Sequence, residues 1–486
     1  MSSPVPAIHE TDSTSSVKKE ENTIDATHAD LEDPETRRRL ERRLLRKLDL
    51  RICILVAIFI LNYIDRSNAA SARLRGFEED LGLHGTQFAT ILAIYYIGYV
   101  LMQVPSNMIL NYVRKPSLYL PGAMFIWGLI SALTGVTQNF AGVLLCRFFL
   151  GFVEAAFFPG ALLLLARWYK REELGLRTSI FFCGLLISIA FSALIASGIL
   201  DAMQGVLGHA AWRWLFFIEG AITMAVAVIS IFILPDFPET SSSWLSPAEQ
   251  ALAIRRMQED AALLPEYPNI GERAGLVMAL KDWKVWWLSV LYAVILLSVS
   301  FNVYFPTLTA TLGYNRTVSL VLCAPPSILV TIISFINAKH SDNTQERFWH
   351  ISIPFAIAIV GYIVGMVSEH RAARYVCFFL IAQALAGIVC FLAWISNSIV
   401  EHPAKRSAAL GMTSGIAQLG AAGGSYIFPK SWGPSYRTSF GISLGASALV
   451  ILMCFIFKVH LASLNRKAQA EEDARGQKKP GYRYML

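Results

Sequence analysis

Residues 147–171 read RFFLGFVEAAFFPGALLLLARWYKR. An apolar run of about 20 residues matches the hydrocarbon thickness of a bilayer, so this stretch predicts a membrane-spanning helix. It carries Arg147 and Glu154, which lie on one helix face about 10 Å apart along the axis. Ionisable groups inside a spanning helix are costly and by default mark a substrate or proton pathway. A structural ion pair that fixes this helix against a neighbour is the alternative.

The composition indicates a membrane protein. Of the 486 residues 55% are hydrophobic and 16% are charged, with a mean hydropathy of +0.48. A soluble protein of this size is less apolar. The net charge of +7 does not indicate nucleic-acid binding, because the placement of Lys and Arg matters more than their sum in a membrane protein. The seven cysteines lack metal-ligand spacing, and we expect neither a metal site nor a cofactor.

Twelve apolar stretches are long enough to cross a bilayer, which predicts an all-α membrane protein of twelve transmembrane helices. They fall at residues 50–70, 87–110, 118–137, 141–167, 176–200, 213–235, 284–307, 317–338, 350–368, 374–397, 407–428 and 436–459. The basic residues lie in both tails, the central loop and the loops on the same side, which predicts that both termini are cytoplasmic. Two halves of six spans are typical of alternating-access carriers, which bind substrate between the halves.

The chain is predicted to have five parts. They are a tail with a basic amphipathic helix (1–49), a first six-helix bundle (50–235), a cytoplasmic linker (236–282), a second six-helix bundle (283–460) and a C-terminal cytoplasmic tail (461–486). The polar composition of residues 1–32 predicts disorder. Asp33 and Pro34 predict the start of the basic helix, which we expect to lie along the cytoplasmic leaflet. Ser246 and Glu249 have the spacing of a capping box and predict a helix in the linker.

Several motifs occur in one order along the chain. They are KLDLR (47–51), NYIDRSN (62–68), QVPSN (103–107), RFFLGFVEAAFFPG (147–160), WYKR (168–171), WRWLFFIEG (212–220), PDFPET (235–240) and KDWKVW (281–286). With them the sequence resembles the major facilitator superfamily from Lys47 to Asn465. Within it, the chain is most similar to the anion:cation symporters, especially the fungal allantoate, nicotinate, pantothenate and biotin permeases. The resemblance implies a carrier, not an enzyme, that works as a monomer. It favours the plasma membrane, with a vacuolar membrane as the alternative.

Some positions depart from the family pattern. The loop after the second span, NYVRKP at 111–116, lacks the acidic residue that the superfamily usually has there, whereas the loop after the eighth span keeps Asp342 and Arg347. Gln418 begins a Gln-Leu-Gly stretch where many relatives have Gly-Asn. The departure at Gln418 leaves the identity of the substrate open.

The resemblance also implies roles for charged residues. In bacterial relatives the acids that match Asp65 and Glu154 carry protons, and the Arg that matches Arg66 contacts the anion. We therefore expect Asp65 and Glu154 to bind protons and Arg66 and Arg147 to hold a carboxylate, for which a planar guanidinium is suited. Because Asp65 and Arg147 lie at similar depth in antiparallel spans, we expect these two side chains to pair.

Neutral side chains complete the predicted substrate site. The second half has almost no intramembrane charge, so it should supply shape and neutral hydrogen bonds. The candidates are Asn302, Tyr304, Trp394, Asn397, Ser414, Gln418 and Tyr426, with Tyr95 and Tyr96 from the first half. Ordinary helix packing is the alternative for each of them. For Glu219, near the outer end of the sixth span, we predict a structural role.

The sequence therefore predicts a secondary transporter in the lipid bilayer that moves a small organic anion together with a proton. It has no phosphate-binding loop of an ATP-driven pump and no motif of a membrane hydrolase. Export of an acidic metabolite and a sensor that binds the anion without moving it remain alternatives. The presence of both Asp65 and Glu154 favours transport, because a sensor needs no proton relay.

Overall fold

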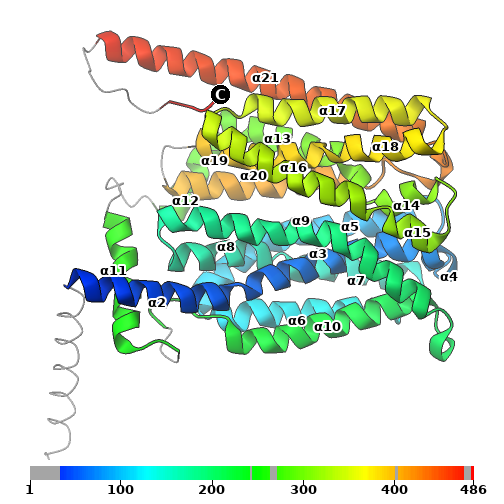
Figure 1. The fold of residues 1–486 in the computed structure, drawn as a ribbon, viewed down its shortest axis with the longest axis horizontal. Helices are drawn as coiled ribbons and strands as arrows, with labels where there is room; N and C mark the ends of the chain where they lie inside the picture. Colours follow the sequence, from blue (N-terminus) through cyan, green and yellow to red (C-terminus); the bar gives the residue numbers. More distant parts are fainter. Residues whose placement is uncertain (1–32, 241–243, 263–270, 400–402, 475–482) are drawn as a thin grey trace, which may run out of the picture.

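The computed structural model describes residues 33–240, 244–262, 271–399, 403–474 and 483–486, and these residues form helices and loops without a strand. The long helices run side by side along the long axis of the molecule (Figure 1). Nine helical stretches in this part of the chain are long and apolar enough to cross a membrane. The other three predicted spans coincide with the helices α3, α9 and α20.

The first six predicted spans form one half. Its helices are α3 (Ile54–Ala72), α5 (Gln87–Val113), α6 (Pro116–Thr134), α7 (Phe140–Glu154) with α8 (Phe157–Trp168), α9 (Arg171–Ala202) and α10 (Ala211–Ile233). The last six form the other half. Its helices are α13 (Trp283–Ser298) with α14 (Phe305–Ala310), α15 (Arg316–Val321) with α16 (Ala324–Thr344), α17 (Phe348–Val367), α18 (Arg371–Ala382) with α19 (Ala384–Ser398), α20 (Pro403–Gly424) and α21 (Arg437–Ala474). The prediction of an all-helical membrane fold is confirmed, and the structure is consistent with twelve spans; the two sets of helices lie beside each other in Figure 1.

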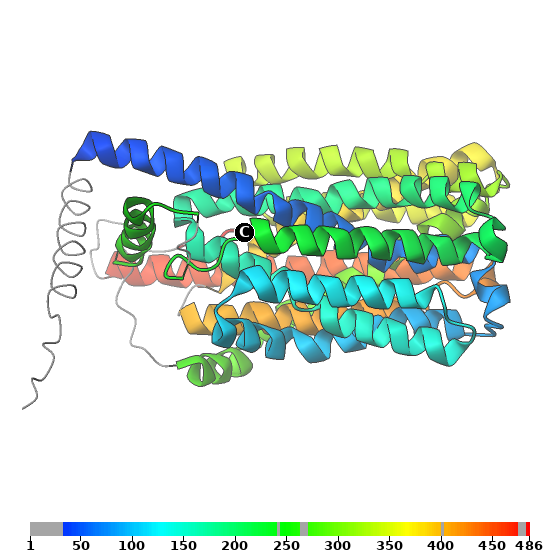
Figure 2. The ribbon, with the colours of Figure 1, turned by 90° about the horizontal axis from the view of Figure 1, so that it is seen from below.

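The two ends of the bundle differ. One end carries α2 (Pro34–Ile52), the linker helices α11 (Pro247–Ala262) and α12 (Gly271–Lys281), and residues 483–486; we name it the linker end (Figures 1 and 2). The opposite end carries α4 (Phe77–Asp80) and the turns that follow α9, α14 and α20; we name it the loop end. The halves meet where α5 packs against α20 and where α9 packs against α15 and α16.

The predicted span 141–167 is divided into two helices. α7 ends at Glu154, a turn follows at Ala155 and Ala156, and α8 begins at Phe157. Pro159 accounts for the break, because proline has no N–H to donate to the carbonyl of Ala155. Glu154 therefore ends a helix in the interior of the bundle, where it is 1% exposed.

Two glycines allow α5 and α7 to pack closely. A Cβ on Gly98 would lie 2.2 Å from the backbone oxygen of Phe148, and a Cβ on Gly151 would lie 2.0 Å from the backbone oxygen of Tyr95. These separations are far below van der Waals contact, so a side chain at either position would push the helices apart. The approach at Gly151 brings Tyr95 beside Glu154, which follows three residues later on α7.

The basic helix α2 packs against the linker helix α11. One residue separates it from α3, and it continues away from the bundle in the same general direction (Figures 1 and 2). The reason is electrostatic: α11 supplies acidic partners, with Glu249 2.8 Å from Lys47 and Glu259 paired with Arg37. The side chain of Asp33 accepts from the backbone N–H of Thr36, as predicted for the helix start.

The linker helix α11 begins as predicted and is anchored by a buried arginine. The Ser246 N–H donates to Glu249 and the Glu249 N–H donates to Ser246 Oγ, which completes the capping box. Further along α11, the Arg256 side chain is 1% exposed and lies 2.8 Å from Glu41 on α2 and 2.6 Å from Glu173 on α9. Arg256 therefore joins three helices at the linker end.

Polar contacts join the two halves at the loop end. Lys430, after α20, lies 3.3 Å from Glu78 and 3.5 Å from Glu79 of the first half. The Tyr426 hydroxyl donates to Thr90 on α5 at 3.0 Å. A cavity of about 510 Å³ lies at this junction, lined by residues of the segments 78–88 and 429–431. The loop end is therefore held closed by contacts that cross between the halves.

The Lys430 contact is stable at neutral pH. Burial opposes the charged amine, but the hydrogen bonds and charges of Glu78 and Glu79 together outweigh it and raise the pKa of Lys430 above its ordinary value. A raised lysine pKa means that the charged contact is complete at neutral pH and is lost only as the pH rises through that higher pKa. The loop end should accordingly stay closed throughout the physiological range.

Arg256→Ala should destabilise the linker end, because it leaves Glu41 and Glu173 without their shared cation. Loss of one member of a buried ion pair costs about 3 kcal/mol. The apparent melting temperature of the purified protein in detergent should fall by several degrees. Arg255→Ala is the matched control, since Arg255 is 37% exposed and its ion pair among the described residues is with Glu259, one turn away on the same helix. Equal melting temperatures for the two variants would contradict the anchoring role of Arg256.

Lys430→Glu should open the loop end, because it places a third carboxylate beside Glu78 and Glu79. A cysteine at Thr90, in a protein whose native cysteines are replaced by serine, should react with a polar maleimide about two- to fivefold faster, the factor that corresponds to an exposed ion pair of roughly 0.5–1 kcal/mol. Arg437→Glu is the control, because Arg437 pairs with Glu369 inside the second half. An unchanged rate in Lys430→Glu would argue against the closing contact.

Candidate functional site

Four predicted charged residues come together inside the first half. Asp65 and Arg66 lie on α3, and Arg147 and Glu154 lie on α7. Asp65, Arg147 and Glu154 are each 1% exposed, whereas the Arg66 side chain is 25% exposed. Because charge is costly to bury, the hydrogen bonds around these groups decide what the site can do.

Glu154 accepts one strong hydrogen bond and keeps one free oxygen. The hydroxyl of Tyr95 on α5 donates to Glu154 Oε2 at 2.5 Å, and Arg66 Nη2 lies 3.8 Å from the same oxygen. Glu154 Oε1 has no hydrogen-bond partner among the described residues. The carboxyl group thus has room for a proton on the free oxygen without loss of the Tyr95 contact.

Aromatic rings surround the Arg66 guanidinium. Its central carbon lies 4.8 Å from the ring centre of Tyr95, 5.5 Å from that of Tyr99 and 5.8 Å from that of Tyr63. A cation over an aromatic face is stabilised by the ring electrons without being neutralised. Arg66 Nε is buried and has no hydrogen-bond partner in the described part of the chain. The guanidinium is therefore positioned with hydrogen-bonding capacity in reserve.

Asp65 is held by two hydroxyl groups. Ser131 on α6 donates to Oδ1 and Thr223 on α10 donates to Oδ2, both at 2.9 Å. The expected direct pairing of Asp65 with Arg147 is not formed. Arg147 Nη1 donates to the backbone carbonyl of Arg66 at 3.2 Å, while its Nε and Nη2 have no partner among the described residues. The predicted helix depths placed Asp65 and Arg147 at a similar level of the bundle. They gave no indication that the Ser131 and Thr223 hydroxyls, from neighbouring helices, would bind Asp65 instead.

Of the neutral candidates, Tyr95, Tyr96 and Asn302 lie at this cluster. Tyr95 contacts Glu154 directly, and the buried Tyr96 ring lies 5.3 Å from the Tyr95 ring. Asn302, just after α13, donates to the hydroxyl of Tyr63 at 2.8 Å. This hydrogen bond brings the second half into contact with the rings that surround Arg66.

The other candidates from the second half form no hydrogen bond or ion pair with the four charged residues in the described part of the chain. The Tyr304 hydroxyl donates to the backbone carbonyl of Ser425, and its ring packs 5.4 Å from that of Phe428, toward the loop end. Ser414 and Gln418 are half-buried on α20, the helix that packs against α5. Tyr426 is exposed in the loop-end junction.

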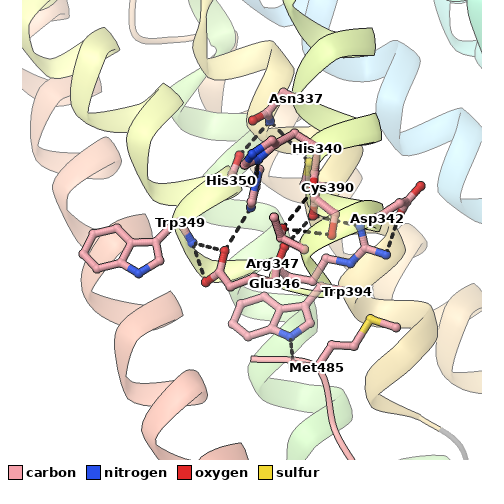
Figure 3. A network of polar contacts seen from close by, with 12 residues as sticks. Asn337, His340, Asp342, Glu346, Arg347, Trp349, His350, Cys390, Trp394 and Met485 are labelled. Atoms are coloured by element: carbon pink, nitrogen blue, oxygen red, sulfur yellow. Dashed lines mark hydrogen bonds and ion pairs between the residues drawn. The ribbon is translucent and has the colours of Figure 1, made fainter.

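Trp394 and Asn397 lie at the linker end, away from the charged cluster. Trp394 Nε1 donates to the backbone carbonyl of Met485 at 3.0 Å (Figure 3), and Asn397 Nδ2 lies 3.2 Å from the Met485 sulfur. Figure 3 also shows Arg347 beside Asp342, which lie 2.7 Å apart. In this structure the two candidates contact the chain itself, because residues 483–486 fold back against α19.

Sequence reasoning missed Tyr63, Tyr99, Ser131 and Thr223. Tyr99 could have been found, because it lies four residues after Tyr95 and thus on the same face of α5. Tyr63 stands inside the NYIDRSN motif, two residues before Asp65. Ser131 and Thr223 are single hydroxyl residues in apolar spans, and nothing in the sequence distinguishes them from ordinary packing residues.

Comparisons with known proteins agree with this architecture. The family model described as Major Facilitator Superfamily matches residues 55–425. The MFS-type transporter cnsO of Penicillium expansum is 33% identical over 478 residues, which cover 92% of this chain and 90% of that protein. A putative tartrate transporter of Agrobacterium vitis is 29% identical over 436 residues, with 88% and 93% covered.

Solved structures show the same fold at low sequence identity. A bacterial homologue of the human lysosomal transporter Spinster, in an inward-facing and occupied conformation, superposes with a TM-score of 0.66 at 16% identity and covers 83% of this chain and 95% of that one. The xylose transporter XylE from E. coli, in a partially occluded inward open conformation, gives a TM-score of 0.66 at 15% identity, with 85% and 98% covered. The chain is a membrane transporter that belongs to the Major Facilitator Superfamily.

Proposed function

We propose that this transporter moves a small organic anion together with a proton. The observation that carries the proposal is the arrangement of Arg66 and Glu154. The Arg66 guanidinium, whose Nε has no hydrogen-bond partner in the described part of the chain, lies 3.8 Å from the buried Glu154 carboxyl group. A carboxylate substrate binds best to a cation that is not already paired with a carboxylate of the protein. Here the cation is Arg66 and the competing carboxylate is Glu154. Protonation of Glu154 meets that need, since it removes the charge that competes with the substrate for Arg66.

The coupling follows from electrostatics. With Glu154 ionised, Arg66 and Glu154 balance each other, and an incoming anion would add a second negative charge to a buried site. With Glu154 protonated, the anion takes the place of that charge beside Arg66. Proton and anion therefore favour each other's binding, and binding linkage of this kind is reciprocal. Asp65 is proposed as the second proton-binding carboxyl group. Arg147, whose Nε and Nη2 have no hydrogen-bond partner among the described residues, is proposed as a second group that holds or gates the carboxylate.

The direction and location are proposed by analogy with the permeases that the sequence resembles. We take the transporter to be a monomer in the plasma membrane, with the linker end cytoplasmic, and to import its substrate. The closed loop end and the contact between Asn302 and Tyr63 support binding between the halves. The Agrobacterium vitis relative is named as a putative tartrate transporter, which supports a carboxylate as substrate class.

The test is proton movement across proteoliposomes that contain the purified protein and an internal pH dye. Tartrate, nicotinate, allantoate, pantothenate and biotin are added one at a time. Inward movement of protons that depends on one of these anions supports symport. An anion that binds without moving protons or itself across the membrane would favour the sensor instead. An anion that moves without a proton signal would show an uncoupled carrier.

Glu154→Gln should abolish anion-driven proton movement, because glutamine cannot bind or release the proton. Exchange of labelled for unlabelled anion should persist, since glutamine resembles the protonated acid. Accumulation and exchange are compared in the same proteoliposomes. Glu172→Gln is the matched control, because Glu172 is exposed at the start of α9. Normal proton coupling in Glu154→Gln would refute the assignment of Glu154 as the coupling group.

Arg66→Lys should weaken anion binding although the charge is kept, because lysine lacks the planar pair of donors that fits a carboxylate. A charge-assisted hydrogen bond is worth about 1.5–3 kcal/mol, so KM should rise roughly 10- to 100-fold. The change should appear in KM more than in kcat. Arg213→Lys is the comparison, since Arg213 donates to the backbone carbonyls of Gly135 and Thr137 near the loop end. An unchanged KM in Arg66→Lys would remove Arg66 from the binding site.

A further inference from the structure

A third acidic residue, Glu219 on α10, is buried beside the charged cluster. It is 2% exposed, and neither of its carboxyl oxygens has a hydrogen-bond partner among the described residues. The sequence favoured a structural role for it, but a structural carboxylate of this burial would be expected to hold a cation or several N–H groups. An ionised group without such partners is strongly disfavoured in an apolar interior.

The surroundings of Glu219 connect it to Asp65. Thr223, one turn after Glu219 on α10, donates to Asp65. Four residues of an α-helix rise about 6 Å, so Glu219 lies about 6 Å closer to the loop end than Thr223 does. Asn68, three residues after Asp65 on α3, is the polar side chain beside Glu219, and its amide nitrogen is also without a partner. Asp65 itself is close enough for the two carboxyl groups to interact electrostatically.

The cations on neighbouring elements are directed elsewhere. Arg73 pairs with Glu78 at 2.8 Å, and Arg213 donates to backbone carbonyls of the turn after α6. Arg147 covers the ring of Phe216, one turn before Glu219, with its central carbon 5.8 Å from the ring centre. On the side of α6, a Cβ on Gly220 would lie 2.7 Å from the backbone oxygen of Gly128, so the two helices pack closely there.

On the side of α9, Ala193, Ala196 and Leu200 belong to the hydrophobic cluster that also contains Trp212, Leu215 and Phe216 of α10. Asp65 is therefore the charged group that acts on Glu219 from the elements packed against α10. Two adjacent carboxyl groups in an apolar interior cannot both be ionised at low cost, so the state of each controls the other.

We propose that Glu219 is a proton-binding group that exchanges its proton with Asp65 and so connects the charged cluster to the loop end. In the exchange, the O–H bond of Glu219 breaks and an O–H bond of Asp65 forms, and the negative charge moves from Asp65 to Glu219. The Thr223 hydroxyl donates to Asp65, and Asn68 is the polar side chain beside Glu219. This inference rests on the proposed proton coupling for its role in transport, but not for the protonation of Glu219 itself.

Infrared spectroscopy of the purified full-length protein in lipid nanodiscs tests the protonation without any substrate. A protonated carboxyl group gives a C=O stretching band that an ionised one lacks. Glu219→Gln should remove one such band at neutral pH. If the glutamine variant does not fold, Glu219→Asp replaces it in the test, and the band should then move to another frequency. Glu172→Gln, which changes an exposed glutamate, should leave these bands unchanged. Identical bands in Glu219→Gln and the unmodified protein would overturn the proposal.

Exchange with Asp65 has its own test. In Asp65→Asn the neighbouring negative charge is gone, so the Glu219 band should disappear at a lower pH than in the unmodified protein. The same pH dependence in both proteins would overturn the coupling of the two groups.

A transport assay then separates the role of Glu219 from the proposed function. In proteoliposomes, Glu219→Gln should reduce the proton-driven accumulation of tartrate, or of another anion that the panel identifies, at least tenfold. Exchange of labelled for unlabelled anion should persist. Full accumulation in Glu219→Gln would remove Glu219 from the proton path. If the unmodified protein couples no anion to protons, the proposed function fails, and the infrared result still decides whether Glu219 holds a proton.

Discussion

A charge buried in a membrane-spanning bundle must find a counter-charge or hydrogen bonds, and four charged side chains on α3 and α7 impose this condition on the first half. The neighbouring helices supply different groups that bind these charges. α5 supplies tyrosines to Glu154 and Arg66, and α6 and α10 each supply one hydroxyl to Asp65. The Tyr95 contact in turn requires the close packing at Gly151, and the break after Glu154 follows from Pro159.

The partners are incomplete, since Glu154, Arg66 and Arg147 keep polar atoms without hydrogen bonds among the described residues. A site with reserve capacity of this kind suits a transporter, whose charged groups must change partners.

Much of the fold was predictable because the bilayer sets the length and polarity of each span. The helices, the division into two halves and the capping box at Ser246 depend on local patterns of apolar and capping residues. The position of α2 was not predictable, since its partners on α11 lie more than 200 residues away. In the site, the motif residues Asp65, Arg66, Arg147 and Glu154 do come together, as their depths indicated. The direction in which Asp65 points depends on Ser131 and Thr223, which no pattern marks. Trp394 and Asn397 could not be placed for the same reason. Their depth in the predicted span does not indicate that they contact Met485, which is far away in the sequence.

The two halves contribute unequally to the chemistry. The first half holds the charged cluster and Glu219, whereas the second half reaches the cluster through the neutral side chain of Asn302. A neutral surface facing a charged one can slide or rock without breaking an ion pair inside the membrane, where such a break is costly. The ion pairs that cross between the halves, at Lys430, instead lie at the loop end, where water can replace the lost partner. This division separates the groups that handle charge from the groups that allow movement.

The linker is attached to both halves, and the attachment limits movement. Arg256 fixes α11 to the first half through Glu41 and Glu173. α12 packs on the second half, where Gly275 contacts the backbone of Ala404 and Asp282 lies 2.8 Å from Lys405. Nine peptide steps connect the end of α11 at Ala262 to the start of α12 at Gly271, and a fully extended chain covers about 3.5 Å per residue. While both attachments hold, the two helix ends cannot separate by more than about 30 Å. Because α11 is attached to the first half and α12 to the second, this maximum separation sets an upper limit on how widely the bundle can open at the linker end.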